Sequence, residues 1–387
     1  MKKLPSPLMF GSIILLFVMG LALRGLALPA ISGDMQWAYI PWYDFLKTHG
    51  IQEIGTNFSD YTPPYLYLLW LSTLTSTFLP NVVAIKSISI FADVINAFLV
   101  YRIVRLKYPI GYTPLLAGAL FWVLPTVMMN SSLWGQADAL YTMFLLLCLY
   151  YLLNNKSLLG VIAFGIAFTI KAQAIFIAPL LAILFFKKRI AWHYFLMVPL
   201  VYLLLDAPAF FLGRSWLGIF TIYSSQAYTF QELSKNAPNL YIFASSISYG
   251  LGTIIGLVLT VLIVGCWILL NARAKFDLSR SAILLMGLVS VAILPFVLPK
   301  MHDRYFYPAD VVSLALAFYF PELWFVPILY QVISTSAYIV FLFNAAPLLT
   351  QSAAILNTLT VSFLVWKQVR TFAPSPLSKI SAKESPA

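Results

Sequence analysis

Ionisable side chains crowd one short stretch in the last third of the sequence. This stretch, LPKMHDRYFYPADV over residues 298–311, holds Lys300, His302, Asp303 and Arg304 between two long apolar runs. Arginine and histidine can hold a phosphate through charge-assisted hydrogen bonds. We therefore expect a phosphate-binding group here. The alternative is an ordinary ion pair between Asp303 and Arg304 beside a belt of aromatic residues.

A second stretch concentrates carboxylates among aromatic side chains. In ISGDMQWAYIPWYDFLKTHG, residues 31–50, Asp34 follows the turn-forming residues Ser-Gly and stands close to Trp37 and Trp42. A carboxylate there could take a proton from the hydroxyl group of an acceptor, and the rings could stack on a sugar. The alternative is that Asp34 caps the helix that follows it.

An indole, an amide and a carboxylate stand close together in NSSLWGQADALYTMF, at Trp134, Gln136 and Asp138. A single helix cap needs only one such side chain, so the cluster favours a pocket for a sugar or an acceptor. The alternative is that Asp138 caps a helix while Gln136 bonds across helices.

Two further stretches carry polar side chains that could meet an anion. FTIKAQAIF places Lys171 and Gln173 inside an apolar run, where a lysine either extends to the interface or binds an anion such as a lipid phosphate. QELSKNAPNLYIF offers Asn236 and Asn239 around a proline, a pattern that a simple turn before a helix would also explain.

The elements that position these residues are membrane-spanning helices. The 387 residues are 61% hydrophobic and only 10% charged, with a mean hydropathy of +0.88, whereas a soluble domain has about 25% charged residues. Apolar runs long enough to cross a bilayer follow one another from Leu8 to Trp366. We predict one all-α domain over residues 1–370 with about 11–13 spans, followed by a disordered cytoplasmic tail over 371–387.

The basic residues predict the orientation of the helices. The net charge of +11 would suggest nucleic acid in a soluble protein, but here Lys2, Lys3 and the stretches FFKKRIAW, NARAKFDLSR and WKQVRTF mark cytoplasmic ends. This orientation leaves loops 31–61 and 213–246 outside, together with all the polar motifs.

The stretch VYRIVRLKYP fits this orientation only if residues 62–80 form a juxtamembrane or partly inserted helix rather than a span. The alternative is that its cations lie outside, near a lipid phosphate. Within the spans, Asp93, Asn96 and Asp206 should face the interior of the bundle. Both cysteines lie in apolar runs, and we expect no disulfide.

Six short motifs in order carry a resemblance to a known family: GD after the first span, PPYLYL, NSSLWGQADALYT, KAQAIFIAPLL, NAPNLY and KMHDRYFYPA. Together they resemble the multi-pass glycosyltransferases of the GT-C superfamily, in particular bacterial relatives of the second GPI mannosyltransferase. The dolichyl-phosphate-glucose glucosyltransferases are similar at a greater distance. The resemblance covers residues 33–310.

The resemblance implies an inverting transfer of a hexose, with mannose suggested by the nearest family, from a polyprenyl-phosphate carrier to a lipid or glycan acceptor. The reaction would take place on the extracytoplasmic face of the plasma membrane, with no cofactor and no nucleic acid. Many members of the superfamily have a paired acidic motif where this chain has the single Asp34, so a divalent metal is not expected but stays open. The implied candidates are Asp34 as catalytic base and, for substrate binding, Trp134, Gln136, Asp138, Lys171, Gln173, Asn236, Asn239, His302, Asp303, Arg304 and Tyr305.

Two other functions fit the same composition. A flippase or transporter of lipid-linked sugars would also have many helices and charges within the membrane, but transporters commonly show inverted repeats and polar groups on both faces. A polysaccharide polymerase or ligase would work on the same face with pyrophosphate-linked donors.

Overall fold

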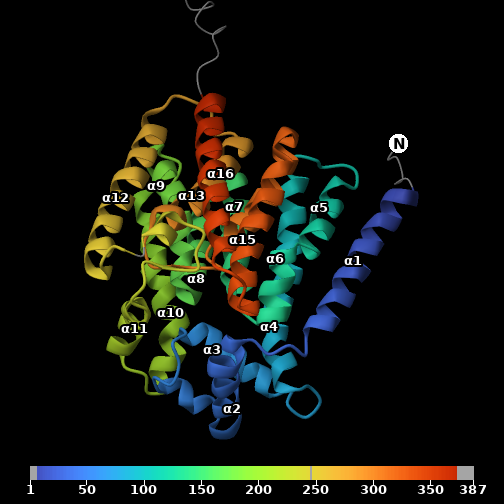
Figure 1. Cartoon of the computed structure of the whole chain (residues 1–387), viewed down its shortest axis with the longest axis vertical. Helices are drawn as coiled ribbons and strands as arrows, with labels where there is room; N and C mark the ends of the chain where they lie inside the picture. The colour runs from blue at the N-terminus through green and yellow to red at the C-terminus, as the bar shows by residue number, and fades with distance from the viewer. Residues whose placement is uncertain (1–6, 245, 373–387) are drawn as a thin grey trace, which may run out of the picture.

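A computed structural model describes residues 7–244 and 246–372, and this part of the chain is almost entirely helical (Figure 1). The helices of the first half are α1 (Pro7–Ala27), α2 (Ile40–His49), α3 (Pro63–Thr73), α4 (Asn81–Arg105), α5 (Thr113–Trp122), α6 (Pro125–Met128), α7 (Asp138–Leu153), α8 (Ser157–Ile170) and α9 (Ala178–Phe186). Those of the second half are α10 (Met197–Phe211), α11 (Trp216–Thr229), α12 (Tyr249–Arg273), α13 (Arg280–Val297), α14 (Tyr307–Tyr319), α15 (Phe325–Phe343) and α16 (Leu348–Phe372).

Short irregular elements connect these helices. They are the π-helical turns η1 (Met35–Tyr39) and η3 (Met129–Trp134), the 3-10 turns η2 (Ile51–Gly55), η4 (Ala172–Ile177), η5 (Trp192–Leu196), η6 (Leu240–Phe243) and η7 (Pro321–Leu323), and the strands β1 (Ser234–Lys235) and β2 (Met301–His302). Helix α16 continues to Phe372, past the predicted start of the tail. The rest of that tail, like Lys2 and Lys3, lies outside the described residues.

The chain is a multi-pass membrane protein, as the composition predicts. Within residues 7–244 and 246–372, seven helical segments are long and apolar enough to cross a bilayer. The pair α5 and α6–η3, bent by 47°, makes an eighth if it is one span. This number is below the predicted range of about 11–13 spans, which would be reached only if four shorter apolar segments, beginning at Asp138, Ser157, Ala172 and Tyr307, also crossed.

Burial distinguishes the central helices from the peripheral ones. In α13, 89% of the apolar window is buried inside the protein, whereas the figure is 11% for α1 and 22% for α12. Because lipid replaces water around a membrane protein, the exposed leucine, isoleucine and phenylalanine side chains of α1 and α12 are suited to face it. Most residues of α7, α13 and α14 are buried.

The segment before α4 forms short helices rather than a span. Pro63 and Pro64 occupy the first turn of α3, where a proline costs no hydrogen bond. At 11 residues, α3 is about 16 Å long, too short for a hydrocarbon core of about 30 Å. Helices α2 and α3 lie together at the lower end of the bundle in Figure 1.

The basic loops gather at the opposite, upper end. Arg280 Nη1 donates to the carbonyl oxygen of Leu106 (2.9 Å), and Lys187 Nζ donates to that of Ala274 (2.7 Å). Both described ends of the chain lie at this upper end in Figure 1. The cations at the end of α4 therefore lie with the other basic loops, which is the arrangement expected if residues 62–80 do not cross.

Candidate active site

Asp34 stands where the chain turns after α1. Its backbone begins η1, but its side chain turns to the 134–136 loop: Oδ2 accepts hydrogen bonds from Trp134 Nε1 (2.9 Å) and from Gln136 Nε2. The carboxylate is 33% exposed. Two donors thus orient a carboxylate that is still open to a ligand, whereas the alternative of a helix cap has no side-chain hydrogen bond here.

The 134–136 loop owes its shape to a glycine. Gly135 ends η3 with φ +81°, a left-handed conformation that side chains disfavour. The turn lets Gln136 donate its backbone N–H to Asn130 (2.9 Å). Trp134 is fully buried, and its ring stacks on Phe341 at 4.7 Å between ring centroids.

Asp138 is the centre of a buried charge cluster. It is fully buried at the start of α7, and its Oδ1 accepts from Lys171 Nζ at 2.5 Å. Its Oδ2 accepts from Asn130 Nδ2 at 2.9 Å. Lys171 has an extended backbone conformation between α8 and η4. The lysine therefore points into the protein and does not extend to the interface.

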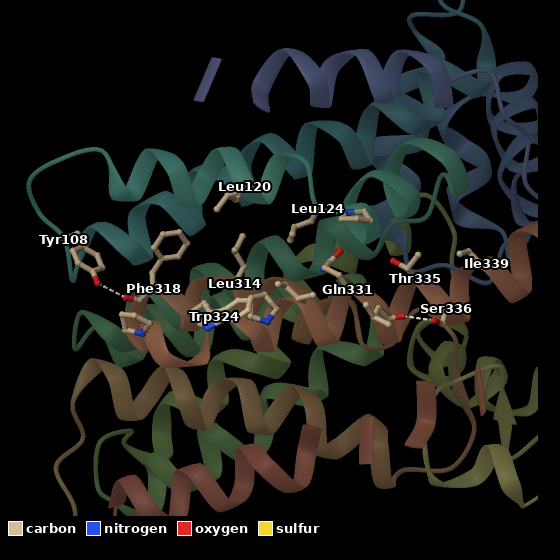
Figure 2. A pocket seen from close by; sticks show the side chains of 16 residues that line it. Tyr108, Leu120, Leu124, Leu314, Phe318, Trp324, Gln331, Thr335, Ser336 and Ile339 are labelled. Atoms are coloured by element: carbon tan, nitrogen blue, oxygen red, sulfur yellow. Dashed lines mark hydrogen bonds between the residues drawn. The ribbon is translucent and has the colours of Figure 1, made fainter. Parts of the chain in front are cut away.

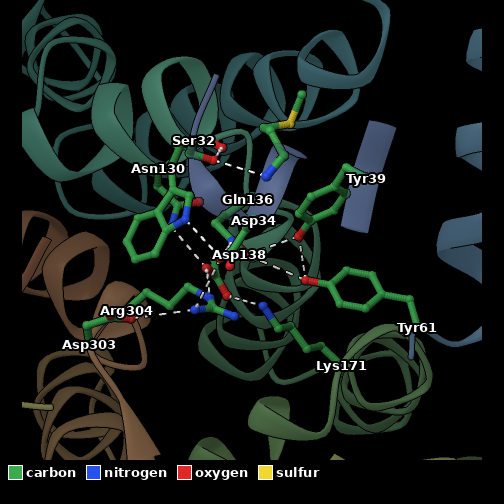
Figure 3. A network of polar contacts seen from close by, with 12 residues as sticks. Ser32, Asp34, Tyr39, Tyr61, Asn130, Gln136, Asp138, Lys171, Asp303 and Arg304 are labelled. Atoms are coloured by element: carbon green, nitrogen blue, oxygen red, sulfur yellow. Dashed lines mark hydrogen bonds and ion pairs between the residues drawn. The ribbon is translucent and has the colours of Figure 1, made fainter. Parts of the chain in front are cut away.

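Arg304 joins the cluster to Asp34, as Figure 3 shows. Its guanidinium lies 3.9 Å from Asp34 Oδ2, 3.5 Å from Asp138 Oδ2 and 3.5 Å from Asp303 Oδ1. Burial raises the pKa of Asp303, whereas the charge of Arg304 lowers it. Burial is the larger effect, and it raises the pKa of this carboxyl to about 7.

The surroundings of His302 disfavour a positive charge on its ring. Its ring packs against Phe230 and Tyr305, with ring centroids 5.1 Å apart in each case. Burial, followed by the charges of Arg304 and Lys235, lowers the pKa of His302 to about 2. A neutral imidazole can offer a phosphate a hydrogen bond only.

These side chains border a polar pocket of about 220 Å³. Seven predicted residues line it: Asp34, Gln136, Lys171, Gln173, His302, Arg304 and Tyr305. Trp134, Asp138 and Asp303 lie directly behind that lining, in contact with Asp34 or Arg304. The parallel pairing of β1 with β2 brings the loop after α11 to this place.

Two predicted residues lie outside the pocket. Asn239 is fully buried and caps η6, because its Oδ1 accepts from the backbone of Tyr241 (3.0 Å). The alternative that it forms a turn before a helix is the one that the structure supports. Asn236 forms a β-bridge with His302 and has φ +54°, so it shapes the loop beside the pocket.

Sequence reasoning missed other residues that line the pocket. Tyr39 and Tyr61 share a hydrogen bond between their hydroxyls (2.6 Å), and Tyr39 also donates to Gln136 Oε1 (3.0 Å). The aromatic density of the first loop was a signal for them, although it did not single them out. The remaining missed residues are Ala38, Asp60, Gln226, Thr229 and Phe230, whereas Trp42, whose ring the sequence suggested for sugar stacking, does line the pocket.

Two larger apolar grooves accompany the polar pocket. One, of about 970 Å³, lies between α3, α4, α7, α8 and α10, and reaches Ile170, the neighbour of Lys171. The other, of about 910 Å³, lies between α5, α6, α14 and α15 (Figure 2). It is lined by a different set of residues, almost all of them apolar apart from Gln331, Thr335 and Ser336. The first groove is the one that adjoins the charge cluster.

Comparison with known proteins identifies the fold. No protein-family model and no curated protein sequence matches the chain. A crystal structure of ArnT from Cupriavidus metallidurans bound to undecaprenyl phosphate is similar with a TM-score of 0.55 at 12% identity, over 93% of this chain and 78% of that one. The apo form of the same protein gives 0.54 at 12% identity, with the same coverage. At 12% identity the likeness shows the fold alone: it confirms the GT-C-like helical membrane fold that we predicted, and it does not show the mannosyltransferase subfamily.

Proposed function

We propose that this protein is a membrane glycosyltransferase that moves a sugar from a polyprenyl-phosphate carrier to the hydroxyl group of an acceptor. One observation carries the proposal: a partly exposed carboxylate, Asp34, and two cations, the buried Lys171 and the largely buried Arg304, border one pocket. The pocket lies in a chain with the fold of ArnT. A base and a phosphate-binding group side by side are the parts that this transfer needs.

The proposed reaction uses Asp34 as the general base. The acceptor oxygen attacks the anomeric carbon from the side opposite the phosphate and gives its proton to the Asp34 carboxylate. The bond between that carbon and the phosphate oxygen breaks, and the electron pair leaves with polyprenyl phosphate. The transfer therefore inverts the anomeric carbon. Trp134 and Gln136 hold the base in place through their hydrogen bonds.

Lys171 and Arg304 would hold the phosphate as its negative charge grows. The ion pairs of Arg304 measure 3.5–3.9 Å, longer than the roughly 2.7–2.9 Å of a full charge-assisted hydrogen bond. Its N–H groups are therefore able to bond to an incoming phosphate. The proposal needs no organic cofactor, and a role for a divalent metal is left to experiment.

The apolar groove beside Ile170 is the proposed place for the polyprenyl chain. Its lining includes Ile170, the residue before Lys171, so a chain lying in it could bring its phosphate to the cations. ArnT crystallised with undecaprenyl phosphate supports a carrier of this class. Tyr39, Trp42 and Tyr61 would then face the sugar. A hexose, with mannose as the first candidate, follows from the sequence resemblance alone.

The proposed setting is the plasma membrane, with the polar pocket on the extracytoplasmic face. The gathering of basic loops at the end of the bundle opposite α2 and α3 supports this orientation. The acceptor is a lipid or a glycan.

The test is a transfer assay with purified protein in nanodiscs. The donors offered are polyprenyl-phosphate sugars, the matching polyprenyl-pyrophosphate sugars and nucleotide sugars, together with an extracted pool of lipids and glycans. We expect product from a polyprenyl-phosphate sugar only, and this donor identifies the sugar. Product from a pyrophosphate donor would indicate a polymerase or ligase instead. Movement of a lipid-linked sugar across the bilayer without transfer would indicate a flippase.

A further inference from the structure

One face of α4 carries a row of polar side chains. Lys86, Ser89, Asp93 and Asn96 follow one another at spacings of three and four residues, so they lie on the same face. At most 2% of any of them is exposed. Such side chains are costly inside a membrane protein unless they are hydrogen-bonded. Each of them bonds to a segment outside α4.

Lys86 binds the end of α1. Its Nζ donates to the carbonyl oxygens of Ala27 (3.1 Å), Leu28 (3.0 Å) and Ala30 (2.6 Å). The last turn of a helix leaves such carbonyls without partners inside the helix, and its dipole favours a cation there. Asp34 follows four residues after Ala30. Lys86 therefore fixes the point from which the segment with the proposed base begins.

Ser89 and Asn96 bind the segment that faces Asp34. Ser89 Oγ donates to the carbonyl oxygen of Gln136 (2.6 Å), and Asn96 Nδ2 donates to that of Ala139 (2.9 Å). These two carbonyls stand on either side of Asp138. The backbone that carries both the amide partner of Asp34 and the carboxylate partner of Lys171 is thus attached to α4.

Asp93 binds three more segments. Its carboxylate accepts from Arg24 Nη2 in α1 (3.1 Å), from Ser131 Oγ in η3 (2.6 Å) and from the Tyr307 hydroxyl in α14 (3.3 Å). Tyr307 also donates its backbone N–H to Arg304 (3.1 Å). One side chain of α4 therefore connects the elements that precede Asp34, carry Trp134 and follow Arg304.

We infer that α4 sets the geometry of the candidate active site, with Lys86 as the positioning residue for Asp34 and Ser89 as the positioning residue for Gln136. All four residues of the row lie outside the lining of the polar pocket. Lipid gives no hydrophobic force between helices, so packing and polar bonds hold the segments in register. The kinetic part of this inference rests on the proposed function, whereas its structural part does not.

The kinetic test compares Lys86→Met and Ser89→Ala with Ser313→Ala. Ser313 is a matched control because it is equally buried but donates to a carbonyl of its own helix, Asp310 (2.9 Å). We expect the kcat of Lys86→Met to fall on the order of 100-fold, and that of Ser89→Ala to fall by less. The donor KM should stay within about threefold, since Lys171 and Arg304 are untouched. Less folded protein with an unchanged kcat would overturn the positioning role.

A second test needs no knowledge of the reaction. The Tm is measured for Lys86→Met, Asp34→Ala and the double variant. If Lys86 holds Asp34 against its partners, removing the carboxylate should lower the Tm less in a protein that already lacks Lys86. The Tm of the double variant should therefore fall by less than the sum of the two single decreases. The Ser313→Ala and Asp34→Ala shifts should add. If Lys86→Met does not fold, Ser89→Ala with Gln136→Leu makes the equivalent cycle.

The outcomes of the two tests separate the two proposals. Additive shifts in the Lys86 or Ser89 cycle would overturn the positioning role whether or not a sugar is transferred. Coupled shifts in a protein that transfers no sugar would support positioning by α4 and contradict only the proposed function.

Discussion

Lys171 and Arg304 are the two cations that meet three carboxylates around one small pocket. Their roles differ, because Lys171 forms a short bond to one carboxylate while Arg304 lies at longer distances from all three. A buried ion pair of the first kind is weak evidence for stability as a whole, but breaking one side of it leaves an uncompensated charge. This difference can be tested through stability as well as activity.

Replacing Lys171 by Met should destabilise the protein strongly. The fully buried Asp138 would lose its 2.5 Å partner, and such losses cost about 3–5 kcal/mol. The free energy of unfolding is measured in detergent by thermal or denaturant unfolding. The double variant Lys171→Met/Asp138→Asn should recover most of that loss, yet stay inactive because the phosphate has lost a cation. Equal instability of the single and double variants would contradict this explanation.

Asp303 should make stability depend on pH. Burial raises its pKa from 3.8 to about 7, so between these values the folded protein keeps a proton that the unfolded chain has lost. The free energy of unfolding then falls as pH rises through this range. Asp303→Asn removes the titration, so its Tm should fall less than that of the wild type from about pH 4 to about pH 8. Parallel Tm profiles of the two proteins would show that Asp303 does not titrate in this way.

At the scale of elements, Gly135 lies where the 134–136 loop contacts the segment that carries Asp34. A Cβ there would lie 2.5 Å from Met35 Sδ, and Met35 directly follows Asp34. Gly111 provides a matched control, since it also has a positive φ of 97° but has open space where its Cβ would be.

Gly135→Ala should therefore cost activity as well as stability. Both Gly135→Ala and Gly111→Ala pay the conformational penalty of a left-handed residue, about 1–2 kcal/mol. Only Gly135→Ala pushes against the segment that carries Asp34, so only this variant should lose most of its transferase activity. Equal activity of the two variants would show that the contact with Met35 is not needed.

The sequence predicts elements better than it predicts contacts. The Pro63–Pro64 start and the basic residues at the end of α4 favour a short helix rather than a span for residues 62–80, and α3 has only 11 residues. The polar motifs supply seven of the fifteen residues that line the pocket. The partners of Asp34 depend on how the 134–136 loop folds back on α1, which no local spacing encodes. The positions of Gln226 and Thr229 depend in the same way on how α11 returns to the bundle.

At the scale of the whole molecule, the two ends of the bundle differ in charge and chemistry. Basic loops occupy the end opposite α2 and α3 in Figure 1. The polar pocket is lined in part by residues of η1 and α2, such as Tyr39 and Trp42. The positions of Lys and Arg along the sequence are enough to predict this difference between the two ends. Such reasoning does not identify the transferred sugar or the subfamily, because a fold does not determine a substrate.

The orientation can be measured by labelling single cysteines in intact cells. Gln52 and Lys275 are exposed at the two ends, and Cys266, which is also exposed, is first replaced by serine. A membrane-impermeant maleimide should label Gln52→Cys and reach Lys275→Cys only after the cells are opened. The reverse pattern would place the pocket in the cytoplasm.

The measurement that tests the central claim most directly is the turnover of Asp34→Asn. Asp44→Asn is the matched control, an exposed carboxylate in the same N-terminal segment, outside the pocket. Both are assayed with the polyprenyl-phosphate sugar that the wild type uses, and binding of polyprenyl phosphate is measured separately. We expect Asp34→Asn to lose at least about 100-fold in turnover while binding stays within a few-fold, and Asp44→Asn to match the wild type. Retained turnover in Asp34→Asn would contradict the account, because the base would then have to lie elsewhere.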